Sequence, residues 1–151
     1  PKLALAPLFI LWFGFGMTSK VVITALVCFF PILESTLQGM HRVTKEQLAL
    51  FQTMQATRWE TLRYLKLPAS IPYIMSGLRV SVILAVVGAV VGEFIGASEG
   101  LGALIIAAQG TMNTPMMFAV LILLTSIGLI LYGSVRWIEQ TVLKKYLKRG
   151  I

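Results

Sequence analysis

Charged residues are scarce in this chain, at 13% of 151 residues against the roughly 25% that is typical of soluble domains. Cysteine is represented by Cys28 alone, which has no disulfide partner within the chain, so a disulfide-stapled secreted module is excluded. A phosphate-binding loop, a G-x-S-x-G turn, a His/Cys cluster and a paired-carboxylate site are all missing. We therefore expect a chain that is not an enzyme by itself and that holds no metal or cofactor of its own.

Hydrophobic residues are abundant instead, at 57%, with a mean hydropathy of +0.84. The net charge of +7 is unevenly spread: residues 41–66 carry +3 and residues 136–149 carry +4, whereas residues 70–135 carry −1. Basic blocks separated by nearly uncharged stretches are typical of a membrane protein. A nucleic-acid-binding protein would instead display its positive charge on a soluble surface, and this composition also excludes a disordered chain.

Three stretches are long and apolar enough to cross a bilayer, which takes about 20 helical residues. They cover residues 21–38, 72–96 and 115–136, the last with Thr114 as its expected cap. A fourth stretch, 3–17, covers only about 22 Å of helix, so we interpret it as the back half of a helix that begins upstream. The prediction is an all-α polytopic membrane protein, a helical bundle in one domain over 1–151 that is truncated at its N-terminus.

The basic residues predict the orientation of these spans. Residues 41–66 and the C-terminal tail are rich in Lys and Arg, whereas residues 97–114 contain neither, so the first two should lie in the cytoplasm and the third outside. Lys20 then falls outside as a single exception. Within the outer connection, Leu101–Ala108 is apolar but too short to span, and predicts a short helix that is re-entrant or lies at the outer surface.

The loop between the first two spans carries two helix-start signals. Thr44 with Gln47 and Thr57 with Glu60 match the S/T-x-x-E/Q capping box. They predict short helices over about 45–54 and 58–66, the second ended by Pro68. Apolar residues recur at helical spacing on both helices. Such a pair could rest on anionic lipid at the membrane surface, or could dock in a groove on a soluble partner.

The spacing in this loop resembles a known signature. Gln55 is followed by nine residues, Leu65, one more residue and then Leu67-Pro68, which resembles the cytoplasmic signature of binding-protein-dependent ABC importer permeases. The segments Ala56–Trp59, Leu67–Ile74 and Gly77–Arg79 are similar to the nitrate/sulfonate/taurine/bicarbonate branch, which also includes permeases for thiamine precursors and riboflavin. Other segments upstream and downstream fit the same branch, so the resemblance covers essentially the whole chain.

The resemblance implies a multi-pass permease subunit of a bacterial-type inner membrane that moves a small solute into the cytoplasm. Its implied partners are cytoplasmic ABC ATPase subunits, which bind the ATP and magnesium, an extracytoplasmic substrate-binding protein, membrane lipid and a second permease copy, with no nucleic acid. The cytoplasmic coupling loop, residues 41–68, would contact the ATPase. The implied contact residues are Gln55, Ala56, Arg58, Trp59, Leu62, Leu65, Leu67 and Pro68.

The first half of the signature departs from the family pattern. The Glu-Ala-Ala of the family falls on Ala49, Leu50 and Phe51. Its glycine falls on Gln55, a substitution expected to remove the backbone freedom that the turn between the loop helices needs, although the capping box at Thr57 could still break the helix there. Two other functions remain open for this chain: an ion-gradient-driven carrier, and a membrane anchor that recruits a soluble enzyme. The transported solute is not evident from the sequence.

Small and ionisable residues within the spans give further candidates. Glycines recur every four residues at Gly88, Gly92, Gly96 and Gly100, a spacing that predicts a helix-packing seam. This seam could serve tight packing within the chain, or it could shear or line the subunit interface. Arg79 and Glu93 are possible pathway residues, since ionisable groups within spans are costly. Arg79 could instead snorkel to the cytoplasmic surface, and Glu93 could have a structural role near the outer surface. About 21 Å separates them along the helix, too far to pair.

Overall fold

The structure is a computed structural model that describes residues 2–96 and 99–147. Every regular element in these ranges is helical, which confirms the all-α prediction. The elements are a 3-10 turn at Lys2–Leu5, α1 (Ala6–Phe13), α2 (Met17–His41), α3 (Lys45–Thr53), α4 (Arg58–Glu60), a π-type segment at Thr61–Lys66, α5 (Leu67–Phe94), α6 (Leu101–Gly110) and α7 (Thr114–Leu147).

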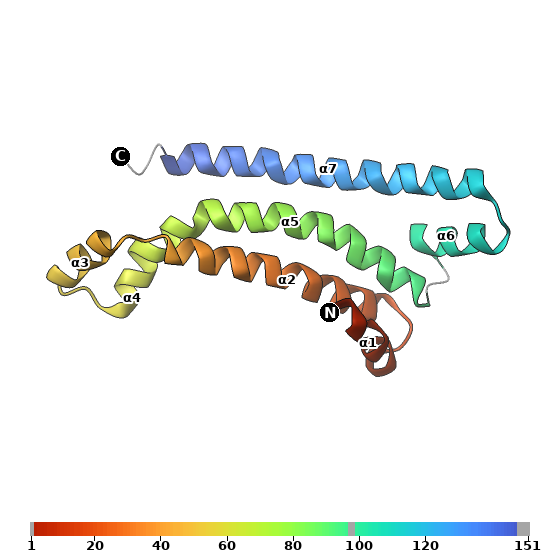
Figure 1. Cartoon of the computed structure of the whole chain (residues 1–151), viewed down its shortest axis with the longest axis horizontal. Coiled ribbons are helices and arrows are strands. Elements are labelled where there is room, and N and C mark those ends of the chain that lie inside the picture. Colours follow the sequence, from red (N-terminus) through yellow and green to blue (C-terminus); the bar gives the residue numbers. More distant parts are fainter. Residues whose placement is uncertain (1, 97–98, 148–151) are drawn as a thin grey trace.

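Three long helices dominate the architecture. Among the described residues, α2, the helical stretch Arg58–Phe94 that contains α5, and α7 are long and apolar enough to cross a membrane. Figure 1 shows them side by side, with α5 in the middle between α2 and α7. The loop helices α3 and α4 lie at one end of this layer, and α6 lies at the other. We call these the loop end and the α6 end.

A stripe of small residues brings α5 against α2. The buried residues of α5 are Ser70, Gly77, Ser81, Gly88 and Gly92. They recur at intervals of seven and four, which keeps them on one face of the helix. Without large side chains in between, the two backbones approach closely, and a β-carbon built at Gly77 would lie only 2.8 Å from the Ser35 Cβ. This close contact between α2 and α5 forms the centre of the fold.

Reciprocal hydrogen bonds reinforce this contact near its middle. The Ser81 hydroxyl donates to the Cys28 carbonyl at 2.8 Å, and the Cys28 thiol donates to the Ser81 carbonyl at 3.2 Å. Each side chain thus satisfies a backbone carbonyl of the opposite helix. Hydrogen bonds of this kind hold helices together where the surroundings are apolar.

The predicted seam of four glycines is wrong in its second half. Gly88 and Gly92 belong to the small-residue stripe and face Thr24 and Lys20 of α2. Because α5 ends at Phe94 rather than at residue 96, Gly96 and Gly100 lie outside it, against the side chains of Phe15 and Glu93. A strict four-residue repeat also drifts by about 40° per repeat around a helix. The contact therefore follows the alternating seven- and four-residue intervals back to Ser81 and Gly77 rather than forward to Gly100.

The N-terminal stretch 3–17 is not one helix. Its helical part ends at Phe13, followed by Gly14 with φ +76, and α2 begins at Met17. The Ser19 hydroxyl donates to the Gly14 carbonyl at 2.5 Å and ties this turn to the first turn of α2. A left-handed glycine is a common helix ending, so the sequence signal for this break was present in Gly14 and Gly16.

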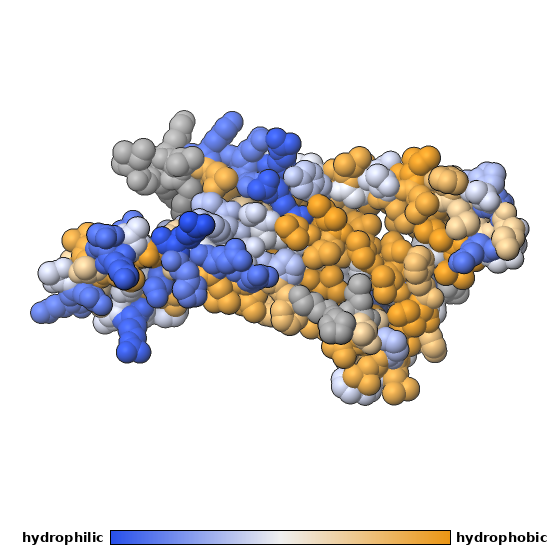
Figure 2. All heavy atoms as spheres, viewed as in Figure 1, coloured by the Kyte–Doolittle hydropathy of each residue, from blue (hydrophilic) through white to orange (hydrophobic). Residues whose placement is uncertain are grey.

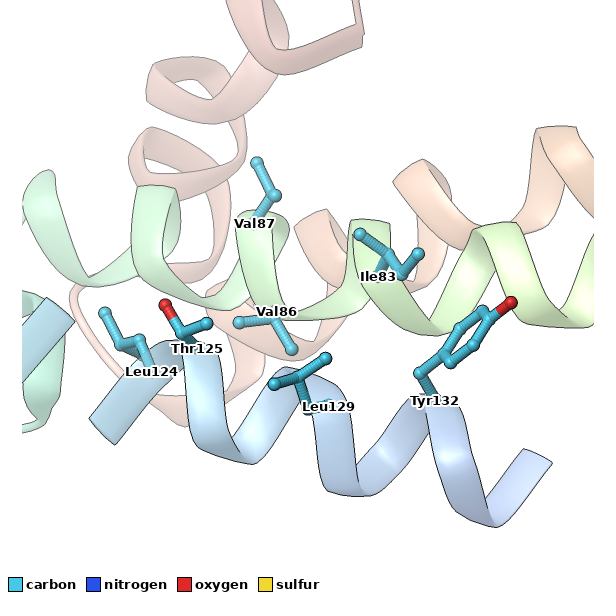
Figure 3. A pocket seen from close by; sticks show the side chains of 8 residues that line it. Ile83, Val86, Val87, Leu124, Thr125, Leu129 and Tyr132 are labelled. Atoms are coloured by element: carbon cyan, nitrogen blue, oxygen red, sulfur yellow. The ribbon is translucent and has the colours of Figure 1, made fainter. Parts of the chain in front are cut away.

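Helix α7 is longer than predicted and begins with a different cap. Asn113, not Thr114, is the capping residue: its Oδ1 accepts the Met116 N–H at 3.2 Å, and Thr114 is the first helical residue. Most of its large apolar side chains are exposed. Between α5 and α7 lies a cavity of about 450 Å³ lined by Ile83, Val86, Val87, Leu124, Thr125, Gly128, Leu129 and Tyr132, most of which Figure 3 labels. Its almost wholly apolar lining could not replace the water shell of a charged solute.

Candidate functional site

The candidate site is the coupling loop, residues 41–68, and both of its predicted capping boxes are confirmed. At the start of α3, the Gln47 N–H donates to Thr44 Oγ1 at 3.3 Å and the Thr44 N–H donates to Gln47 Oε1 at 3.1 Å. At the start of α4, the Glu60 N–H donates to Thr57 Oγ1 at 3.2 Å and the Thr57 N–H donates to Glu60 Oε2 at 2.7 Å. These caps separate the loop into two short helices.

The second box has an additional bond that makes it sensitive to protonation. The Thr57 hydroxyl donates to the same Glu60 Oε2 at 2.8 Å. The hydrogen bonds from the Thr57 backbone N–H and hydroxyl stabilise the carboxylate form and so lower the pKa of Glu60. The corresponding position of the first box is Gln47, which does not titrate.

Gln55 adopts the left-handed conformation that we did not expect of a glutamine in place of the family's glycine. Its φ is +54, the conformation for which glycine is favoured at the end of a helix. The Gln55 N–H donates to the Gln52 carbonyl at 2.9 Å and the Ala56 N–H to the Phe51 carbonyl at 3.0 Å, the two bonds of a Schellman motif. The turn between the loop helices is therefore preserved, with strain at Gln55 in place of a glycine.

The loop helix is continuous with α5, which corrects the prediction that Pro68 ends it. Helical structure runs without a break over the 37 residues of Arg58–Phe94. Residues Thr61–Lys66 are π-type, and the Leu67 N–H donates to the Leu62 carbonyl five residues back. A proline ring normally clashes with the carbonyl four residues earlier, and the wider π turn relieves this clash at Pro68.

The predicted contact residues of the loop differ in exposure. Gln55, Arg58, Trp59 and Leu67 are exposed, whereas Ala56, Leu62, Leu65 and Pro68 are half-buried. Three exposed apolar side chains that the sequence analysis did not single out as contacts, Leu50, Met54 and Tyr64, join Trp59. In Figure 2 this end of the molecule is largely hydrophilic, with apolar patches among the polar side chains. Aromatic and methionine side chains such as Trp59, Tyr64 and Met54 are enriched at protein–protein interfaces, which favours this surface as a docking site.

Arg79 forms an ion pair that the sequence analysis missed. Its Nε lies 3.0 Å from Glu139 Oε2 on α7, and the Glu139 side chain is 11% exposed. Glu139 is one of only two residues classed as buried on α7 among those whose burial is described, together with Val120. In the sequence, Glu139 lies among basic residues and counted only toward the net charge of residues 136–149. A role for Arg79 in a pathway stays a prediction.

Glu93 lies at the α6 end, where its carboxylate caps α6. Its Oε2 accepts the Gly102 N–H at 2.6 Å. Because the first amides of a helix have no partner within the helix, this bond satisfies one of them. A role for Glu93 in a pathway also stays a prediction. Glu93 also lines two cavities, of about 350 and 410 Å³.

The fold and the loop together define an integral membrane protein with a pair of short helices exposed at one end of its spanning helices. Comparison with known families agrees: residues 1–144 match the binding-protein-dependent transport system inner membrane component family, and the chain belongs to it. An inner-membrane location follows from this family and from the three apolar helices.

Curated relatives support this assignment. The chain is 44% identical over 138 residues to a probable ABC transporter permease protein of Haemophilus influenzae, covering 91% of this chain and 56% of the relative. It is 42% identical over 144 residues to the riboflavin transport system permease protein RibX of Chloroflexus aurantiacus, covering 95% and 54%. It is 38% identical over 143 residues to the formylaminopyrimidine transport permease protein ThiX of Halalkalibacterium halodurans, covering 95% and 57%. The chain thus spans about half the length of these relatives.

Proposed function

We propose that this chain is the membrane-spanning part of an ABC importer permease, with residues 41–68 docked in a cytoplasmic ATPase. The observation that carries the proposal is the continuous helix Arg58–Phe94, which joins the exposed loop directly to a membrane-spanning segment. A partner that moves the loop would therefore also move α5, without a flexible joint between them. ATP and magnesium would be bound by that partner, and the chain itself would catalyse no reaction.

The transport mechanism follows from this connection. ATP-driven closure of the ATPase would push on α3 and α4, tilt α5 and switch access from the outer to the inner side. Two copies of the permease would enclose the pathway, as the resemblance to the family implies. A binding protein on the outer side would deliver the solute. Two relatives are named for riboflavin and formylaminopyrimidine transport, so heterocycles are the first solutes to test, followed by taurine, nitrate and bicarbonate.

Docking can be tested at a matched pair of tryptophans. Trp59, in the loop, and Trp12, at the opposite end of the molecule, are both 66% exposed. The variant Trp59→Ala should weaken co-purification of the full-length permease with its ATPase at least tenfold, whereas Trp12→Ala should leave it unchanged. Truncation of an aromatic hot-spot residue costs about 2 kcal/mol or more, a factor of about 30, so a tenfold loss is the smallest effect expected. Equal binding by wild type and Trp59→Ala would contradict docking through this surface.

The orientation is tested with one cysteine. The protein carries Arg58→Cys, and Cys28→Ser keeps a hydroxyl donor for the Ser81 carbonyl. A membrane-impermeant thiol reagent should leave residue 58 unlabelled in intact cells and label it in inverted vesicles. Labelling from outside would overturn both the topology and the docking. Uptake by the reconstituted permease, ATPase and binding protein then separates the proposal from its alternatives: uptake driven by an ion gradient alone indicates a carrier, and no uptake indicates an anchor.

A further inference from the structure

The carboxylate of Glu93 lies close against the first turn of α6. Glu93 is in the last turn of α5, and Gly102 is in the first turn of α6. Their hydrogen bond, at 2.6 Å between Oε2 and N, is shorter than the roughly 2.7–3.2 Å that is usual for an N–H···O bond. The N-terminal end of a helix also carries partial positive charge, which attracts a carboxylate. The bond thus ties the end of one helix to the beginning of the next.

Two glycines provide the space that this carboxylate occupies. A β-carbon at Gly102 would lie 2.8 Å from the Glu93 Cβ and 2.9 Å from its Oε2, and 3.1 Å from the Val90 carbonyl oxygen. A β-carbon at Gly100 would overlap the carboxylate itself, and Gly100 has a φ of +124 that other residues rarely adopt. At the other end of α6, Gly110 has no atom within 4 Å of its β-carbon position. The need for glycine is therefore local to Glu93.

Apart from this bond, α6 packs against both α5 and α7 through apolar contacts. It buries Gly102, Ile105 and Ala108 along one face, and much of the remainder is exposed, including Leu104 and Ile106. Among the side-chain hydrogen bonds found in the described residues, the Glu93–Gly102 bond is the one that joins α5 to α6. Small apolar contacts alone allow a short helix to slide. A directional bond at its first turn fixes its position along α5.

We propose that Glu93 is a positioning residue that clamps α6 to α5, so that both move as one body when the coupling loop shifts α5. This inference rests on the proposed function. The helix Arg58–Phe94 is about 55 Å long, so a small tilt at the loop end becomes a displacement of several ångströms at the α6 end. The clamp transfers that displacement to α6 and changes access at the outer side. Glu93 thereby acts through α6 and does not need to touch the solute.

The clamp itself is tested without the ATPase. Spin labels are placed at Val80 of α5 and Ile106 of α6, which are 49% and 45% exposed, in the full-length permease in lipid nanodiscs with Cys28→Ser. The pulsed EPR distance distribution should be narrow in the wild type. It should widen at least twofold in Glu93→Ala, which removes the acceptor, and in Gly102→Ala, which displaces the carboxylate. Glu93→Gln, which keeps an acceptor oxygen, and Gly110→Ala should stay narrow. Equal widths in wild type and Glu93→Ala would overturn the clamp.

A second measurement separates coupling from mere folding. In the reconstituted importer, Glu93→Ala and Gly102→Ala should consume several times more ATP per solute imported, with an unchanged rate of ATP hydrolysis. Glu93→Gln should restore the ratio, and Gly110→Ala should not alter it. An unchanged ratio in Glu93→Ala despite a wider distance distribution would overturn the transfer of motion. If the wild type shows no ATP-driven uptake, the proposed function fails, whereas the EPR distances still judge the clamp.

Discussion

The guanidinium of Arg79 lies 3.0 Å from the carboxylate of Glu139 and joins α5 to α7. Helix α7 otherwise presents mostly exposed apolar side chains, and a cavity of about 450 Å³ separates part of it from α5. The Arg79–Glu139 ion pair, which is partly shielded from water, therefore helps to determine the position of α7 on α5. Arg79 has a partner within the chain, so snorkelling is not needed to explain its place on the helix.

Removal of one partner of this pair should destabilise the protein. We expect Glu139→Gln and Arg79→Gln each to lower the free energy of unfolding by about 2 kcal/mol, between the values for exposed and buried pairs. The exchange Arg79→Glu with Glu139→Arg should recover at least half of the loss. A double-mutant cycle, measured by unfolding of the purified protein in detergent, isolates the coupling energy. A cycle that closes to zero would mean that the two charges act independently.

Substitution of Gln55 by glycine should stabilise the loop. The left-handed conformation costs a non-glycine residue about 1–2 kcal/mol. Glycine avoids this cost, but it loses more conformational entropy on folding than other residues, which offsets part of the stabilisation. A net gain of about 0.5–1 kcal/mol is expected for Gln55→Gly, visible as a higher thermal midpoint. Met112, with φ +53 at the end of α6, forms the same motif, so Met112→Gly is the matched variant for comparison with Gln55→Gly. A lower midpoint in Gln55→Gly alone would show that the glutamine side chain makes a compensating contact.

The sequence predicted local features well where one or two neighbouring residues determine them. Both capping boxes and the short helix after Gly100 form as expected, because each depends on a few hydrogen bonds or a short apolar run. The bend at Gln55 was misjudged because the Schellman bonds outweigh the intrinsic preference of a single residue. Pro68 was misjudged for a similar reason, since a π turn accommodates a proline that would end an α-helix.

Features that depend on contacts between distant segments could not be predicted in this way. The partner of Arg79 lies 60 residues away on α7, and the sequence offered no means to pair it with Glu139. The true packing stripe runs through Ser70, Gly77 and Ser81, where serine performs the same spatial role as glycine. A search restricted to glycine every four residues found Gly88 and Gly92 but extended the stripe in the wrong direction.

The small-residue stripe predicts which glycines tolerate a methyl group. Gly77→Ala would bring a β-carbon to 2.8 Å from the Ser35 Cβ and 3.0 Å from the Pro31 carbonyl oxygen. We expect a loss of about 1–3 kcal/mol, as for an overpacked core, and a lower thermal midpoint in detergent. Gly128→Ala on α7 is the control, because nothing lies within 4 Å of its β-carbon position. Comparable midpoints for the two variants would contradict the close approach of α2 and α5.

The capping box at Thr57 predicts a pH dependence of the loop. Because hydrogen bonds from Thr57 lower the pKa of Glu60 in the folded loop, Glu60 stabilises the cap above its unfolded pKa, near 4.5, and this contribution disappears as the pH falls through the lower folded value. A spin label at Tyr64, which is 65% exposed, should therefore become more mobile as the pH falls from 4.5 through the lowered pKa of Glu60.

The control for this titration is Glu60→Gln. The glutamine keeps an acceptor oxygen for the Thr57 N–H at every pH, as Gln47 does for Thr44 in the first box. Label mobility in this variant should be nearly constant between pH 3 and pH 7, because the remaining carboxylate of the loop, Glu46, lies in the first turn of a different helix, α3. An equal loss of order in wild type and Glu60→Gln would assign the acid transition to another group. A flat profile in the wild type would show that the Schellman turn and the continuous helix into α5 hold this segment without the carboxylate.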